Sequence, residues 1–138
     1  MSKTVELVRK HINPKQFWKS DLETQINILK KLFQDLCSLY KIEDASIEIK
    51  IAPFFYRMTG GGCVFPPKRV VLYKVSLMTF LHEFAHLLFG YDEEKTNLWS
   101  HKVFYLAFPE LYVKNAKEGK FFHVVPLEKV MSFTECLK

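Results

Sequence analysis

Cysteine is scarce in this chain, and long apolar runs are missing from it. There are only three cysteines, an odd number at wide spacing (Cys37, Cys63 and Cys136), which argues against a disulfide framework and against a zinc ribbon. No uncharged apolar run reaches the roughly 18 residues that a transmembrane helix needs. Residues 1–6 lack the apolar segment of a signal peptide. These absences predict a cytoplasmic protein without a membrane span.

The composition is that of a globular domain with a modest positive charge. Hydrophobic residues make up 49% of the 138 residues, and 13 of them are Phe, so the chain can bury a core. No internal repeat or low-complexity segment divides it, which favours one domain over residues 1–138. The formal net charge is +5, which allows a weak association with nucleic acid without requiring it.

Hydrophobic periodicity predicts an α+β fold in which helices precede a small sheet. Helical spacing predicts a short helix from Thr4 to Ile12, then a longer one behind a capping box that begins at Ser20. The pattern then alternates, with one covered and one solvated face, which is typical of a mainly antiparallel sheet backed by helices on one side. Strands are expected at residues 46–51, 54–58, 63–65 and 69–75.

The most informative stretch is His82-Glu83-Phe84-Ala85-His86, which has the pattern H-E-x-x-H. Residues four apart lie on the same side of a helix, so His82 and His86 can direct two imidazoles at one metal ion. Glu83 can then reach a water molecule beside the ion and act as a general base. This combination is typical of zinc peptidases.

The helix that carries this pattern is expected to be buried. Ser76 can cap it, residues 77–89 form it, and Gly90 ends it. Apolar residues surround it on nearly every side, as in a helix at the centre of a domain. Burial of a neutral polar group without a partner costs about 2–7 kcal/mol. One bound zinc ion would supply the histidines with that partner.

A zinc site of this kind needs a third protein ligand and an open position for water. We expect His101 to be this ligand, because it lies on the apolar face of a following helix within residues 97–108 and because imidazole suits zinc. The rival is Glu110. Glu93 and Glu94 are weaker candidates, because they lie in a polar stretch that is expected to face solvent.

The order and spacing of these residues resemble those of SprT-like metalloproteases, which include the Spartan-type DNA–protein crosslink proteases. Gly61-Gly62-Cys63 precedes the His82–His86 motif, His101 follows it after fifteen residues, and Tyr105 comes four residues later. The likeness covers residues 58–108. It implies a zincin-like fold and a peptidase that acts on proteins or peptides.

The resemblance also implies the roles of particular residues. His82, His86 and His101 would be the zinc ligands, and Glu83 would be the base. Lys102 departs from the glycine that often follows the third histidine in this family, and the chain has no zinc ribbon. A minimal, stand-alone zincin therefore fits as well as a protease coupled to DNA.

The implied reaction is hydrolysis of a peptide bond. Zinc lowers the pKa of a bound water from about 15.7 towards 7, and Glu83 would carry the proton to the leaving amine. A further donor would stabilise the oxyanion. Tyr105 is a candidate, together with Tyr112 and His123, and no spacing separates the three. An extended substrate is expected to pair with an edge strand at residues 69–75.

Two other interpretations stay open. A non-catalytic zincin would hold its metal and bind DNA or a protein partner. A latent peptidase would have a blocked site, with either Cys63 or Cys136 in the open metal position or the segment 121–138 across it. Within that segment we expect a strand at residues 121–125 and a helix at residues 127–137.

Overall fold

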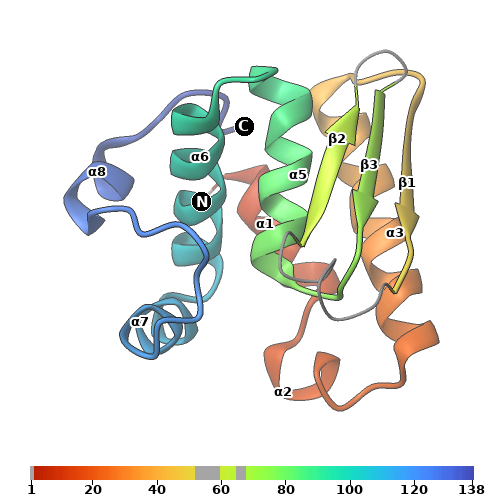
Figure 1. Ribbon diagram of the computed structural model, residues 1–138, viewed down its shortest axis with the longest axis horizontal. Helices are drawn as coiled ribbons and strands as arrows, with labels where there is room; N and C mark the ends of the chain where they lie inside the picture. The colour runs from red at the N-terminus through yellow and green to blue at the C-terminus, as the bar shows by residue number, and fades with distance from the viewer. Residues whose placement is uncertain (1, 52–59, 65–67) are drawn as a thin grey trace.

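The computed structural model describes residues 2–51, 60–64 and 68–138, which form an α+β fold (Figure 1). Among these residues, no helix is long and apolar enough to cross a membrane. The elements in chain order are α1 (Lys3–His11), α2 (Pro14–Phe17), α3 (Leu22–Tyr40), β1 (Ala45–Ile49), β2 (Gly61–Val64), β3 (Lys68–Leu72), α5 (Leu77–Phe89), α6 (Glu93–Ala107), α7 (Pro109–Lys117) and α8 (Leu127–Ser132).

The described strands form a mixed sheet in the order β1-β3-β2. β2 and β3 are antiparallel, with Gly61 opposite Leu72, whereas β1 and β3 are parallel, with Ile47 opposite Val70. The prediction of a mainly antiparallel sheet is therefore wrong for β1, because one-sided burial does not encode strand direction. β3 is central in this sheet, so the expected edge at residues 69–75 is wrong too. The strand expected at residues 54–58 lies outside the described residues.

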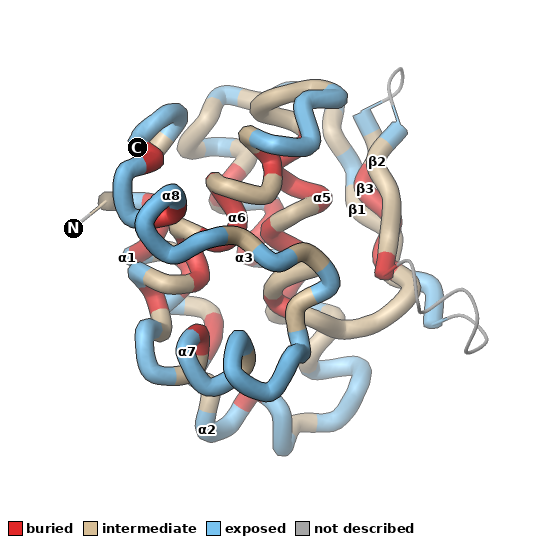
Figure 2. The backbone as a smooth tube through the Cα atoms, turned by 60° about the vertical axis from the view of Figure 1, so that its left-hand side comes forward, coloured by how far each residue is buried: buried red, intermediate tan, exposed pale blue. Residues whose placement is uncertain are grey.

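Helix α5 begins and ends where the sequence predicts. The Ser76 hydroxyl accepts a hydrogen bond from the Thr79 amide at 3.3 Å, and Gly90 ends the helix with a φ of 63°. Phe80 and Phe84 are completely buried. The helix lies between the sheet and α6 (Figure 1), and the helices lie on one side of the sheet, with buried residues concentrated around α5 (Figure 2). The H-E-x-x-H stretch is thus at the centre of the fold.

Two helices begin at residues that the sequence analysis did not choose. Asp21, rather than Ser20, caps α3 by accepting from the Thr24 amide at 2.9 Å, while the Ser20 hydroxyl donates back to the Gln16 carbonyl. Asp92 caps α6 by accepting from the Lys95 amide at 3.0 Å. Helix α6 therefore begins at Glu93, several residues before the expected start, and this acidic stretch is not a loop.

The C-terminal part differs most from expectation. Residues 121–125 form no strand, α8 ends at Ser132, and α7 was not predicted. The last residues return to the core: the Cys136 carbonyl accepts from the Trp99 indole at 3.0 Å, and the Lys138 carbonyl accepts from the Thr4 amide at 3.0 Å. The two ends of the chain accordingly lie side by side (Figure 1).

Trp99 offers a test of this core. It is completely buried, packs against Phe84 and Tyr40, and anchors the C-terminal residues. Trp99→Ala should lower the free energy of unfolding by about 3–5 kcal/mol, because it leaves a large cavity and an unpaired carbonyl. Urea denaturation measures this loss. Trp18→Ala is the control, since Trp18 is 44% exposed; equal losses in the two variants would contradict the assignment.

Candidate functional site

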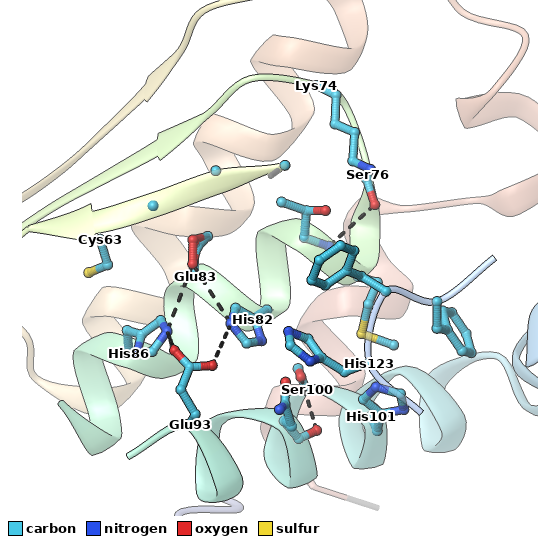
Figure 3. Close-up of a pocket in the computed structure, with 18 of the residues that line it drawn as sticks. Cys63, Lys74, Ser76, His82, Glu83, His86, Glu93, Ser100, His101 and His123 are labelled. Carbon is cyan, nitrogen blue, oxygen red and sulfur yellow. Dashed lines mark hydrogen bonds and ion pairs between the residues drawn. The ribbon is translucent and has the colours of Figure 1, made fainter. Parts of the chain in front are cut away.

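A cavity of about 800 Å³ lies against the polar side of α5. The other walls are β2, the first turns of α6 and the segment 119–123. Figure 3 shows that the side chains of all three histidines predicted as ligands, and of Glu83, come from the two helices that border it. The cavity therefore gathers residues that are far apart in the sequence.

His82 and His86 lie one turn apart on α5, and both meet Glu93. The Nε2 atom of His86 is 2.9 Å from Oε1 of Glu93, and Nε2 of His82 is 3.4 Å from Oε2 of the same side chain. Glu93 reaches the histidines from the first turn of α6 although its side chain is 58% exposed (Figure 3). A single carboxylate thus bridges the two imidazoles of the motif.

Glu83 is buried beside the same histidines. Its Oε1 atom is 3.9 Å from Nε2 of both His82 and His86. Burial raises the pKa of Glu83 to about 7, with an opposing effect from His86 and a further increase from the negative charge of Glu93. A carboxyl group with a pKa near neutrality can take up a proton and give it back.

The orientation of His86 is fixed by the residue that ends its helix. Its Nδ1 atom is 2.6 Å from the carbonyl oxygen of Gly90. Because a carbonyl oxygen only accepts, Nδ1 carries the hydrogen, and in the neutral ring Nε2 then has a free lone pair. That lone pair faces a carboxylate oxygen of Glu93 at 2.9 Å. Two acceptors at this distance repel unless a proton or a metal cation lies between them.

The imidazole of His82 also has the protonation state of a metal ligand. Burial lowers its pKa to about 4, although Glu93 opposes the shift, and the electrostatic effects of the neighbouring His86 and His123 add to it. The ring is therefore neutral at pH 7, which is the form that binds metals. Two imidazoles and a carboxylate match the donors found at zinc sites.

His101 lies elsewhere in the same cavity, on α6. It is buried, and its Nδ1 atom is 2.6 Å from the hydroxyl of Tyr112. Burial lowers the pKa of His101 to about 4, with smaller electrostatic contributions from the neighbouring His123 and His82. The structure thus brings His101 to the cavity with a tyrosine as its hydrogen-bond partner, while Glu93 makes the contacts with the motif.

The other candidates are at the surface or outside the cavity. Glu94 and Glu110 are exposed. Tyr105 stacks on Tyr112 with ring centroids 5.5 Å apart and does not line the cavity. Of the three candidate oxyanion donors, His123 is the one whose side chain lines it.

His123 enters the cavity from the segment after α7. Its ring is stacked on that of His82, with centroids 5.4 Å apart and an angle of 13° between the planes. Ligand atoms of His82, Glu93 and His123 all lie within 4.8 Å of one another. His123 therefore forms one group with His82 and Glu93, while His82, Glu83 and His86 form a second group, so that His82 is common to both (Figure 3).

A further wall of the cavity is β2, an edge of the sheet that the described strands form. A Cβ atom on Gly61 would lie 2.4 Å from the Val71 carbonyl oxygen and 3.3 Å from Cγ of Glu83. The first of these contacts requires glycine at this position, and the second shows how closely the strand passes Glu83. Cys63 follows on the same strand, and burial, with the charge of Glu83, raises the pKa of its thiol to about 12. Cys136 lies with the C-terminal residues at Trp99 and not in the cavity lining.

The sequence analysis did not predict the contacts of Glu93 with the two histidines, and it did not place His123 in a possible metal-binding group. The available signal for Glu93 was Asp92, because an Asp directly before two glutamates is typical of a helix N-terminus. That signal would have placed Glu93 in the first turn of a helix rather than in a loop. The signal for His123 was the alternation of residues 121–125, which are inward and outward in turn although they form no strand.

Comparisons of the chain with protein-family models, with curated proteins and with solved structures give no match.

Gly61 and Gly62 provide a matched pair for the close approach of β2. Gly61→Ala should lower the free energy of unfolding by about 1–3 kcal/mol, because the new methyl group collides with Val71 and Glu83. Gly62→Ala should change it little, since no atom of the described residues lies within 4 Å of a Cβ atom there. Thermal or urea unfolding of both variants measures the difference. A Gly61→Ala protein as stable as the Gly62→Ala protein would contradict the packing described.

Proposed function

We propose that this protein is a zincin-like, zinc-dependent endopeptidase that hydrolyses peptide bonds in proteins or peptides. The single observation that carries the proposal is the meeting of His82, His86 and Glu93 beside the buried carboxyl group of Glu83. The lone pair of His86 facing a carboxylate supports a cation at this point. The likeness of the sequence to SprT-like proteases supports the same class, with a cytoplasmic location as its expected setting.

The proposed ligands are His82, His86 and Glu93, which leave one position open for water and substrate. When bound, zinc supplies a Lewis acid that polarises the substrate carbonyl and makes water acidic. His101, which the sequence predicts as the third ligand, remains the alternative. Its Nδ1 contact with Tyr112 leaves Nε2 for such a role, because a metal-bound histidine usually bonds an outer partner through its other ring nitrogen.

Glu83 has the role of proton carrier in this proposal. Its buried carboxylate takes a proton from the attacking water and returns it to the leaving amine. Its Oε1 atom is 3.9 Å from Nε2 of both imidazoles, which places it beside the proposed metal position. A group that transfers protons in this way contributes about 10²–10⁴-fold to the rate.

The substrate is proposed to lie along β2. This strand is an edge of the described sheet, borders the cavity and passes Gly61 directly beside Glu83. An extended peptide that adds to such an edge is held by backbone hydrogen bonds. The scissile bond would then lie beside the carboxyl group of Glu83, and recognition would depend little on the side chains of the substrate.

Replacing Glu83 tests the chemistry without removing a proposed ligand. Glu83→Gln should bind zinc with the stoichiometry of the wild-type protein, because the amide keeps the shape of the side chain. Cleavage of casein or of a fluorogenic peptide should fall by at least about 100-fold, because an amide does not accept the proton.

Cleavage by the Glu83→Gln protein at the wild-type rate would reject this mechanism. A wild-type protein that binds one zinc ion and cleaves nothing would favour the non-catalytic interpretation instead. That interpretation predicts retention on DNA that weakens steeply with salt, since phosphate contacts release counterions.

Zinc content distinguishes the two candidates for the third ligand. Glu93→Ala should reduce zinc affinity by about 100-fold or more, because even residues that only support ligands contribute about 10–100-fold. His101→Ala should retain the metal. Glu94→Ala is the matched control, since Glu94 is its exposed neighbour on the same helix turn. Competition with a chromophoric chelator measures the affinities, and loss of zinc in His101→Ala with retention in Glu93→Ala would reverse the assignment.

A further inference from the structure

The segment between α7 and α8 places a third imidazole in the zinc cluster. His123 is stacked on His82, and its ligand atom lies within 4.8 Å of those of His82 and Glu93. In Figure 3 its ring lies between His82 and His101, on the side of His82 away from β2. The segment that carries His123 follows α7 and is separate from α5 and α6, the two helices that carry the other proposed ligands.

His123 is held there by the packing of its neighbour. The ring of Phe121 contacts Tyr112 at 5.0 Å, His101 at 5.3 Å and Phe104 at 5.5 Å between centroids. Residues alternate after it, so that Phe122 is 80% exposed and Val124 is 93% exposed while His123 faces inward. The packing of the Phe121 ring against these aromatic residues thus sets the direction of the His123 side chain.

We propose that His123 is a fourth protein ligand of the zinc ion and that it closes the catalytic centre in the resting protein. The proposal deepens the function proposed above and rests on it. Zinc sites with four protein ligands are closed and structural, whereas catalytic sites keep one position for water. With His82, His86 and Glu93 as the first three ligands, an imidazole from His123 takes the position that water and substrate need.

The closing contact is suited to release. Of residues 122–124, Phe122 and His123 line the cavity, and Phe122 and Val124, which flank His123, are both largely exposed to solvent. Moving these residues outward therefore removes little apolar surface from the core, so that the opening free energy is at the low end of the range for local motions. A peptide that pairs with β2 and presents its carbonyl to the metal competes with His123 for one coordination position.

Zinc affinity and cleavage in His123→Ala test the proposal together. Affinity should fall by about tenfold or more, because a ligand contributes at least as much as the outer-shell partners that support it. At saturating zinc, cleavage should rise; if the closed form holds about nine molecules in ten, the rise is about tenfold. Val124→Ala is the control, because Val124 is exposed and does not line the cavity, and it should match the wild type in both measurements.

Each of the other possible outcomes contradicts one particular part of the proposal. Unchanged zinc affinity in His123→Ala overturns the ligand role, and unchanged affinity with slower cleavage identifies His123 as a donor to the substrate instead. Weaker affinity without faster cleavage overturns the closing role. If the wild-type and Val124→Ala proteins bind no zinc, or if Glu83→Gln cleaves normally, it is the proposed function that fails.

A measurement on the wild-type protein does not depend on any variant folding. In protein labelled with ¹⁵N-histidine, NMR detects the ring nitrogens of all five histidines. Zinc should shift the nitrogens of His82, His86 and His123, while His11, which pairs with Asp35 at 2.6 Å, should not respond. Unchanged ring nitrogens of His123 in the zinc-bound protein would overturn the proposal.

Discussion

The arrangement around the end of α5 depends on two carboxyl groups that share one imidazole in a partly buried place. Nε2 of His86 is 2.9 Å from a carboxylate oxygen of Glu93 and 3.9 Å from Oε1 of the buried Glu83. Two carboxylates repel each other, and burial strengthens the repulsion because little water screens it. A positive charge between them, either a proton or the proposed zinc ion, makes the contacts favourable.

The surrounding elements keep that arrangement rigid. Trp99 joins α6 to α5 and to the C-terminal residues, so the helix of Glu93 is held against the helix of the two histidines. Gly61 lets β2 press on Glu83 from the other side. The sheet and the core therefore hold Glu83, the proposed base, beside the proposed ligands, while the wall formed by the segment 119–124 contains the largely exposed Phe122 and Val124.

The sequence alone predicted those features of the fold that depend on residues close together in the chain. The bounds of α5, its cap at Ser76 and its burial followed from periodicity and from Gly90. The parallel pairing of β1 with β3 was not accessible, because strand direction depends on the path of the whole chain. Glu93 is exposed as expected, but its contacts with the two histidines were not predicted, because Asp92 was not recognised as a cap. Of the expected ligands, His82 and His86 converge, and whether His101 joins them is a question that spacing alone does not answer.

The backbone conformation of Gly90 determines the geometry of the short connection between α5 and α6. Its φ of 63° and ψ of −130° belong to backbone that glycine alone adopts easily, and its carbonyl orients the ring of His86. Only Tyr91 and Asp92 separate it from Glu93. One extra residue in this corner would rotate Glu93 away from the histidines and displace the carbonyl as well. The connection is therefore the part of the cavity rim where insertions and deletions are least tolerated, unlike ordinary surface loops.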